Sequence, residues 1–209
     1  INIGCDKKNI FNYGPFCSDN LIKFKPINLI EIENKFNFKI KHNKYFIFTY
    51  HPETEYKDNE INKIKLILNV FKKYKNIFFI MTAANHDFSS IKINNFLKKF
   101  ATLNKKNFIY IKSFGSEYYL SLVKKSSGVI GNSSSGIIEV PYFNKPTINI
   151  GDRQKGRFQF NSVININFKN FDLKNAINKV LNKKLLLNNK NYYKKNVSYR
   201  TYLKITSIL

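Results

Sequence analysis

Residues 127–141 read Ser-Gly-Val-Ile-Gly-Asn-Ser-Ser-Ser-Gly-Ile-Ile-Glu-Val-Pro, a short apolar segment followed by a small polar cluster and a second apolar segment. The first segment predicts a buried strand that ends near Gly131. Serine, asparagine and glycine suit a tight turn from strand to helix, because the polar side chains accept hydrogen bonds from unpaired N–H groups and glycine tolerates a positive φ. A strand that leads directly into a helix is typical of the βαβ units of α/β folds.

The same turn predicts a site for phosphate. The unpaired N–H groups and the positive end of a helix dipole attract anions, and the hydroxyls of Ser133 and Ser134 can donate hydrogen bonds to phosphate oxygens. Glu139 is expected one to two turns into the helix, where a carboxylate can hold a ribose diol, as acidic residues do in other α/β nucleotide sites. Together these residues predict a bound nucleotide diphosphate.

Arginine is scarce in this chain. Lys and Arg number 36, only three of them are Arg, and two of these, Arg153 and Arg157, lie just after the next predicted strand. A planar guanidinium group pairs bidentately with phosphate, which the Lys ammonium group cannot do. Their position favours an anion site, and the alternative is a Gly/Ser-rich turn with two solvated arginines.

Composition limits the class of protein. The 209 residues, with a mass of 24.6 kDa and 43% hydrophobic residues, fit one α/β domain with a substantial core. No run approaches the roughly 18 apolar residues of a membrane helix, so no membrane partner is expected. The first residues resemble the interior of a longer protein, which predicts a fragment or a separated domain. Cys5 and Cys17 lack metal-site spacing and are expected to be reduced thiols in the cytoplasm.

The formal net charge of +23 raises the alternative of a basic nucleic-acid-binding module. The excess is almost entirely Lys, spread evenly along a chain rich in Asn, Ile, Phe and Tyr. Nucleic-acid sites usually gather Arg and stacking aromatic side chains, and the sequence shows no such group. We therefore expect no nucleic-acid partner, and the charge can help to capture anionic substrates.

Short apolar segments alternate with amphipathic ones, which predicts βαβ units and a Rossmann-like, mostly parallel sheet. The predicted strands are 45–49, 77–82, 108–111, 128–130, 147–150 and 163–166. The predicted helices are 59–74, 89–100, 116–125, 135–142 and 173–181, with one or two more in the tail. We expect three parts: a connecting segment at 1–44, a nucleotide-binding domain at 45–184 and a helical tail at 185–209.

Ligands of open α/β sheets bind outside the carboxyl ends of the strands, and polar residues follow several predicted strands. His51 follows the first strand and can act as an acid, a base or a donor to phosphate, although a His before Pro is often only a turn residue. Asn85 and His86 follow the second, where turn formation is the simpler interpretation of His86. Phe114 follows the third and can offer its edge or its backbone amide to a base, or pack in the core.

Several of these segments resemble the C-terminal half of the hydrolysing UDP-N-acetylglucosamine 2-epimerases of bacterial sialic-acid pathways. The resemblance spans nearly the whole chain. It is carried by Thr-Tyr-His-Pro-Glu-Thr at 49–54, Asn-His-Asp at 85–87 and, most specifically, GNSSSGIIEVPYFNKPTINIGDRQKGR at 131–157. Ile-Phe-Asn-Tyr-Gly at 10–14, with Asp19 and Asn20, is similar to the family's linker into this domain.

The resemblance implies a two-domain, GT-B-like protein in which the C-terminal domain holds UDP and the sugar reacts between the halves. The contacts that it implies are Ser133 and Ser134 with the diphosphate, Glu139 with the ribose, Arg153 with the phosphate region and Phe114 with the uracil edge, while Asn85 and the catalytic residue His51 face the cleft.

The family reaction eliminates UDP across C1 and C2 of UDP-N-acetylglucosamine and then adds water, giving N-acetylmannosamine and UDP without a metal or a nicotinamide cofactor. The family's proton-transferring carboxylates belong to the N-terminal half, so this chain alone is expected to bind UDP weakly and to be inactive. The complete protein is expected to be a homo-oligomer. A GT-B glycosyltransferase is the alternative, and the sugar can be N-acetylglucosamine or a diacetylated bacillosamine analogue.

Overall fold

The structure is a computed structural model that describes residues 6–53, 59–84, 88–182 and 192–208. The chain forms two compact units, of which the larger covers Lys25–Leu187 and the smaller combines Ile1–Phe24 with Asn188–Leu209. Within the described ranges, the β-sheet belongs to the larger unit. The residues that were predicted to hold a ligand lie in this unit too.

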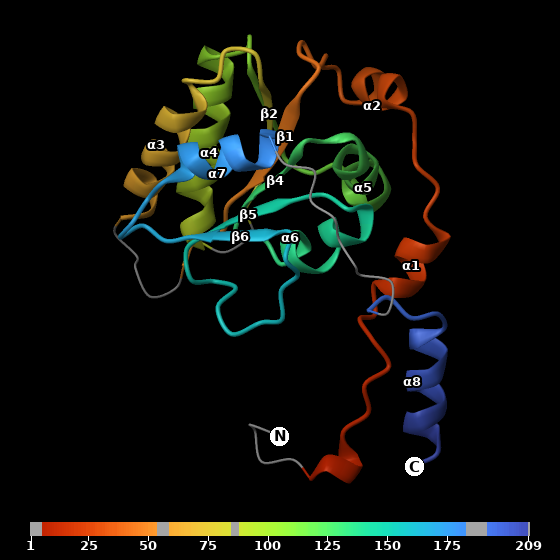
Figure 1. The fold of residues 1–209 in the computed structure, drawn as a ribbon. Coiled ribbons are helices and arrows are strands. Elements are labelled where there is room, and N and C mark those ends of the chain that lie inside the picture. Colours follow the sequence, from red (N-terminus) through yellow and green to blue (C-terminus); the bar gives the residue numbers. More distant parts are fainter. Residues whose placement is uncertain (1–5, 54–58, 85–87, 183–191, 209) are drawn as a thin grey trace. The chain divides into compact units, whose positions relative to one another are not determined.

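A six-stranded parallel sheet forms the middle of the larger unit, in the order β3-β2-β1-β4-β5-β6 (Figure 1). The strands are β1 Tyr45–Thr49, β2 Phe78–Thr82, β3 Phe108–Ile111, β4 Gly128–Gly131, β5 Thr147–Ile150 and β6 Val163–Ile166. Each neighbouring pair is parallel. The predicted Rossmann-like sheet is therefore confirmed, and the strand limits differ from the prediction by at most one residue.

Helices cover both faces of this sheet, as Figure 1 shows. One face carries α3 (Glu60–Phe71), α4 (Phe88–Leu103) and α7 (Leu173–Asn182). The other face carries α2 (Leu29–Lys35), α5 (Gly115–Lys125), α6 (Ser135–Ile138) and the 3₁₀ helix η2 (Val140–Phe143). Parallel strands that are covered on both sides need no polar face, which is why β1 and β2 read as almost continuous apolar runs.

Two hydrophobic clusters fill the spaces between these layers, and alternate residues of a strand enter opposite clusters. In β1, Phe46 and Phe48 belong to the cluster under α3, α4 and α7, whereas Tyr45 and Ile47 belong to the cluster under α2 and α5. All five residues of β1 are buried. Both cores therefore hold β1 in place, and with it the residues that follow in the chain.

Short helices lie in the segment before β1, for which the sequence shows no regular periodicity. They are the 3₁₀ helix η1 (Lys7–Asn9), α1 (Ser18–Lys23) and α2. Asn28 caps α2 by accepting a hydrogen bond from the Ile30 N–H at 3.0 Å, and Ile32 is fully buried in the second cluster. Helices of this length are stabilised by packing rather than by propensity, so their sequences carry little signal.

The single helix predicted at 135–142 is wrong in its length. The structure has α6 at Ser135–Ile138, then Glu139, then η2 at Val140–Phe143. Pro141 explains the interruption, because it has no N–H to donate within an α-helix and its ring restricts the residue before it. Glu139 therefore lies at the end of one helical turn, rather than inside a longer helix.

In the smaller unit, Asp19 caps the N-terminus of α8 (Val197–Thr206). Its carboxylate accepts hydrogen bonds from the N–H of Val197 at 3.2 Å and of Ser198 at 2.9 Å. These donors, Ser198 above all, hold the pKa of Asp19 below its ordinary value, because they favour the charged carboxylate. The cap joins two segments that lie 178 residues apart in the sequence.

We expect the N-terminus of α8 to fray in acid. A carboxyl group with a lowered pKa stabilises the folded state above its unfolded-state pKa of about 3.8, and this contribution disappears as the pH falls through the folded-state pKa. The hydrogen-exchange protection of the Val197 and Ser198 amides should therefore fall in that range. Asp19→Asn should lack this protection already at neutral pH, whereas Asp172→Asn, beside α7, should keep it. Unchanged protection in Asp19→Asn would exclude the cap.

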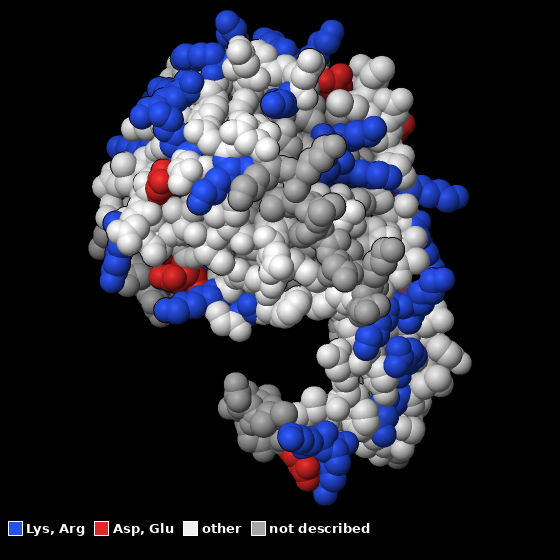
Figure 2. Space-filling view, viewed as in Figure 1, with Lys and Arg blue, Asp and Glu red and all other residues white. Residues whose placement is uncertain are grey.

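On the face seen in Figure 2, basic side chains are distributed rather than gathered at one place. Figure 2 shows Lys and Arg in separate groups around the visible face, with uncharged residues between them. This distribution agrees with the even spread of Lys along the sequence. Among the described residues, no helix is both long enough and apolar enough to cross a membrane.

Candidate functional site

The chain reverses its course across the sheet between β1 and β4. From β1 it proceeds outward through β2 to β3, and it returns with β4 on the other side of β1. Ligands of open α/β sheets bind outside the carboxyl ends of the strands at such a switch point. His51 follows β1 here, and Asn132, Ser133 and Ser134 follow β4. The structure thus brings together His51 and the serine turn, although His51 and Asn132 lie 81 residues apart in the sequence.

The side chain of Asn132 binds both polar groups of the His51 backbone. Its Oδ1 accepts a hydrogen bond from the His51 N–H at 2.7 Å, and its Nδ2 donates to the His51 carbonyl at 2.8 Å. Asn132 is fully buried and His51 is 8% exposed, so both hydrogen bonds are shielded from water. They fix the backbone from which the His51 imidazole extends.

Ser133 and Ser134 form the turn between β4 and α6, and both are half-buried. Their carbonyls accept the first hydrogen bonds of the helical turn. In the described chain the Ser134 hydroxyl makes no capping hydrogen bond. Its O–H group is a donor that suits a phosphate oxygen. Because α6 has only four residues, its dipole is small. Hydroxyls and backbone N–H groups of the turn, rather than a long helix, would have to hold a phosphate group here.

Glu139 ends α6 and is half-buried. Close to it, the Ser135 hydroxyl donates a hydrogen bond to Tyr119 Oη at 3.0 Å. Burial raises the pKa of Tyr119 to about 12; the Ser135 hydrogen bond opposes this change, and the negative charge of Glu139 adds to it. Tyr119 therefore stays protonated at neutral pH, and the charge of the Glu139 carboxylate acts on its hydroxyl group.

Arg153 follows β5 and is held at two points. Its Nη1 donates to the Asn132 carbonyl at 3.1 Å, and its backbone N–H donates to Glu53 Oε1 at 3.2 Å. The same Glu53 oxygen accepts a hydrogen bond from the Asp152 N–H at 2.9 Å, and Lys63 Nζ lies 3.2 Å from the other oxygen. The loop after β5 is therefore bound to the loops after β1 and β4, and the guanidinium group is brought to the switch point.

The ring of Phe114 lies in the second hydrophobic cluster and is only 4% exposed. It makes edge contacts with the rings of Phe36 and Phe38, with centroid distances of 4.6 and 6.1 Å. Of the predicted alternatives, core packing is therefore observed for the ring. A contact with uracil would have to use the Phe114 backbone amide, which lies between β3 and α5.

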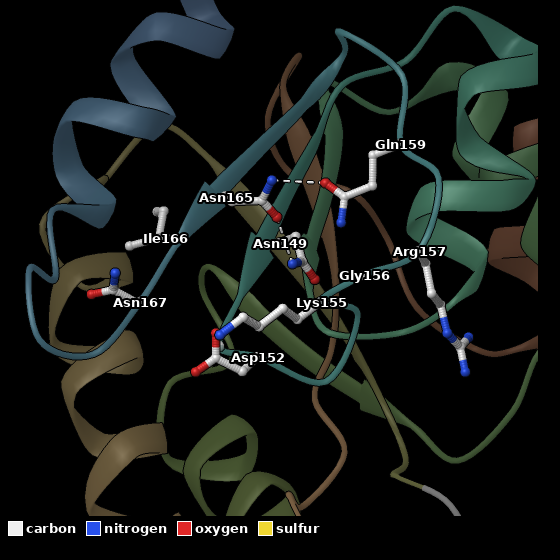
Figure 3. A pocket seen from close by; sticks show the side chains of 10 residues that line it. Asn149, Asp152, Lys155, Gly156, Arg157, Gln159, Asn165, Ile166 and Asn167 are labelled. Carbon is white, nitrogen blue, oxygen red and sulfur yellow. Dashed lines mark hydrogen bonds between the residues drawn. The ribbon is translucent and has the colours of Figure 1, made fainter. Parts of the chain in front are cut away.

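Arg157 is exposed and lines a pocket of about 360 Å³ at the carboxyl ends of β5 and β6. Its lining residues are Asn149, Gly151, Asp152, Lys155, Gly156, Arg157, Gln159, Asn165, Ile166 and Asn167. Figure 3 shows that the amides of Asn149, Asn165 and Gln159 form a chain of hydrogen bonds along one wall, with both distances 2.7 Å. The pocket thus continues the polar rim beyond the Arg153 loop.

Part of the predicted rim cannot be compared with the structure. Asn85, His86 and Asp87, which were predicted to follow the second strand, lie outside the described residues. The same holds for Thr54, at the end of the His51 segment.

Three residues of the site were not predicted as site residues: Asn132, Glu53 and Gln154. Gln154 is fully buried, and its Nε2 donates to the Asn132 carbonyl at 2.7 Å. A usable signal existed for Asn132, because a polar residue directly after a buried strand has to find a partner. Glu53 gave no such signal, since the N–H groups that donate hydrogen bonds to it lie 99 and 100 residues away in the sequence.

Comparison with protein families matches residues 1–207 to the family described as UDP-N-acetylglucosamine 2-epimerase. The chain belongs to this epimerase family. Polysialic acid biosynthesis protein P7 of Escherichia coli is 38% identical over 183 residues, which are 87% of this chain and 45% of that protein. GDP/UDP-N,N'-diacetylbacillosamine 2-epimerase (hydrolyzing) of Campylobacter jejuni is 36% identical over 172 residues, 82% of this chain and 44% of that protein. The chain thus spans slightly less than half the length of these two relatives.

The fold of the epimerase family is also found among solved structures. UDP-GlcNAc 2-epimerase of Methanocaldococcus jannaschii, solved in complex with UDP-GlcNAc and UDP, matches with a TM-score of 0.72 and 20% identity. The match covers 100% of this chain and 57% of that one. At this level of identity the likeness shows the fold, and it confirms a GT-B-like arrangement of the parallel sheet and its helices.

Proposed function

We propose that the chain is the C-terminal, UDP-binding part of a hydrolysing UDP-N-acetylglucosamine 2-epimerase. The reaction would convert UDP-N-acetylglucosamine and water into N-acetylmannosamine and UDP, for the synthesis of sialic-acid-type sugars. The observation that carries the proposal is the switch point between β1 and β4, where His51, the serine turn and Arg153 converge. Membership of the epimerase family supports it, and so does the word hydrolyzing in the name of the Campylobacter relative.

The diphosphate would lie on the serine turn. The hydroxyls of Ser133 and Ser134 donate to its oxygens, and the guanidinium group of Arg153 pairs with its charge. When the bond between C1 and the diphosphate oxygen breaks, negative charge accumulates on that oxygen, and donors already fixed in position stabilise it. His51, whose backbone is fixed on the same rim, is the catalytic residue placed beside this leaving group, where it can supply a proton.

The nucleoside would extend from the diphosphate toward Glu139 and α5. The Glu139 carboxylate accepts hydrogen bonds from the ribose diol, and the backbone amide of Phe114 donates to the uracil edge. Asn85 is proposed to face the cleft in which the sugar reacts. In that cleft a base removes the C2 proton while UDP departs, and water then adds its hydroxyl to C1 and a proton to C2 from the opposite face. We propose that the base belongs to an N-terminal half.

A second sugar is favoured by one observation. The Campylobacter relative is named for GDP/UDP-N,N'-diacetylbacillosamine, so the substrate of this chain's protein can carry that sugar instead of N-acetylglucosamine. The test is to supply each UDP-sugar, without an acceptor, to the protein together with its proposed N-terminal half. A hydrolysing epimerase releases UDP and the free 2-epimer. Retention of every UDP-sugar until an acceptor is added would instead indicate a GT-B glycosyltransferase.

UDP binding by this chain is the first measurement. We expect calorimetric titration to detect UDP, and we expect Arg153→Ala and Ser134→Ala each to lose about 1–3 kcal/mol of binding free energy, the usual effect of a charge-assisted hydrogen bond. Arg200→Ala and Ser207→Ala, which change the same residue types in the smaller unit, serve as controls and should bind like the parent. Equal affinities in all five proteins would contradict the assigned site.

A further inference from the structure

We propose that Asn132 is a positioning residue that holds His51 and Arg153 in one fixed arrangement toward the diphosphate. The inference rests on the proposed function, and it assigns to that site a fully buried residue whose two ends act on two different loops. Its side chain fixes the loop after β1, and its carbonyl fixes the loop after β5.

The side-chain end acts through a matched pair of hydrogen bonds. One amide satisfies both the N–H and the carbonyl of His51, at 2.7 and 2.8 Å. Without it, two buried backbone groups would lose these hydrogen bonds, and the loss of buried hydrogen bonds is costly enough to shift the loop. A side chain that only filled space would not need this geometry. The amide therefore fixes the position and direction of the His51 backbone where the chain leaves β1.

The backbone carbonyl of Asn132 holds the guanidinium group of Arg153. The Asn132 carbonyl oxygen has two lone pairs, and it accepts from Arg153 Nη1 at 3.1 Å and from Gln154 Nε2 at 2.7 Å. A guanidinium group has five N–H donors in a rigid plane, so one anchored donor sets the direction of the others. Arg153 can thus bind an anion while one edge of its plane stays attached to the loop after β4.

Glu53 adds a second connection between the same loops. It lies two residues after His51, and its Oε1 accepts the backbone N–H of Asp152 at 2.9 Å and of Arg153 at 3.2 Å. Arg153 is therefore held by its backbone from the β1 loop and by its guanidinium group from the β4 loop. The three loops form one hydrogen-bonded assembly, and Asn132 is the residue that joins all of them. Such preorganisation is what stabilisation of a departing diphosphate requires.

Asn107 provides a matched control on the same sheet. It is also a buried asparagine, 8% exposed, and its Nδ2 donates to the carbonyls of Ile77 at 2.9 Å and Lys75 at 2.7 Å. It precedes β3, at the amino end of the sheet, whereas Asn132 follows β4 at the carboxyl end. Asn107→Ala thus removes buried hydrogen bonds of the same kind without touching the proposed site.

The first test measures, without any ligand, whether the Asn132 side chain holds the His51 backbone. Hydrogen exchange is compared between the parent chain, Asn132→Ala and Asn107→Ala. We expect the protection of the His51 amide to fall about tenfold or more in Asn132→Ala, as loss of a buried hydrogen bond allows. Amides of the central strands, such as Ile47, should stay protected in a folded variant. Asn107→Ala should leave His51 unchanged. A folded Asn132→Ala with unchanged His51 protection would overturn the proposal.

The second test measures UDP affinity in a double-mutant cycle. Asn132→Ala should weaken UDP binding about tenfold, and Asn107→Ala should not. If the Asn132 side chain acts through His51, adding Asn132→Ala to His51→Ala should weaken binding by less than about threefold. Fully additive losses would overturn the positioning role. Absence of UDP binding by the parent would instead overturn the proposed function, and this inference with it.

Should Asn132→Ala fail to fold, Asn132→Ser replaces it in both tests. The serine hydroxyl keeps a polar atom in the buried position but is too short to reach both backbone groups of His51. The same outcomes are expected, and affinity and exchange equal to those of the parent would again contradict the proposal.

Discussion

Gly131→Ala is expected to lower the free energy of unfolding by about 4 kcal/mol or more, which is exceptional for a single methyl group. Gly131 has a φ of +134°, a conformation that residues with a Cβ rarely adopt. An added Cβ would also overlap the Thr49 carbonyl oxygen and would lie 2.7 Å from the Thr49 carbonyl carbon. Both atoms belong to the backbone of β1, so neither can move without disturbing the central strand.

The matched control is Gly115→Ala. Gly115 also has a positive φ, +70°, but a Cβ there would meet nothing within 4 Å. This variant should therefore cost only about 1 kcal/mol, the price of the backbone conformation alone. Urea unfolding followed by circular dichroism gives both values. If the two variants lose the same stability, the close approach of β4 to β1 is not what makes residue 131 a glycine.

The same approach determines the geometry of the site. Gly131 brings β4 so near to β1 that the Asn132 N–H donates to the Thr49 carbonyl at 3.1 Å, while the Asn132 side chain reaches His51. Any Gly131→Ala protein that still folds should consequently bind UDP poorly, since the β4 loop must move away from the β1 loop. Stability and binding are coupled at this position because one backbone contact supports both.

The sheet could be predicted because its strands carry two signals at once. Residues 45–48 are apolar without interruption, and His51-Pro52 follows soon after, so both the fully buried strand and its end are visible in the sequence. The rim followed from the same reasoning, because parallel strands place their carboxyl ends together. His51 and the serine turn were therefore predicted to share the rim on which they are found.

The partners within the site could not be predicted in this way. The groups that donate hydrogen bonds to Glu53 depend on how closely the loops after β1 and β5 approach each other. This approach is set by strand order and packing rather than by local sequence. The ring of Phe114 was ambiguous for a similar reason, since Phe36 and Phe38 come from a segment with no recognisable periodicity. The interruption of the predicted helix near Glu139 was different. Pro141 indicated it in the sequence, and the prediction gave too little weight to that signal.

Phe79→Ala is expected to lower the free energy of unfolding by about 3–5 kcal/mol, the usual cost of removing a fully buried aromatic ring. Phe79 lies in β2 with no exposed surface. Its ring stacks on Phe71 at a centroid distance of 4.2 Å and on Phe108 at 5.3 Å, and it also stacks with Phe46 at 6.2 Å. These rings come from α3, β3 and β1, so the truncation leaves a cavity that three elements would have to close together.

Phe158→Ala is the matched control, since Phe158 is 62% exposed and surface substitutions usually change stability by less than about 0.5 kcal/mol.

Phe79→Leu separates the effect of side-chain volume from that of ring stacking. Its stability should recover much of the loss, because leucine refills most of the cavity. Its free energy of unfolding should still be lower than the parent's by roughly 0.5–1.5 kcal/mol, which aromatic pairs contribute beyond their buried area. Denaturant midpoints of the parent, Phe79→Ala, Phe79→Leu and Phe158→Ala measure these differences in stability. A loss below about 1.5 kcal/mol in Phe79→Ala would mean that the helices can close over the gap, and that the aromatic cluster is less rigid than its packing indicates. A large loss would show that the layer under α3, α4 and α7 holds β1 in place, and therefore supports the loop that carries His51.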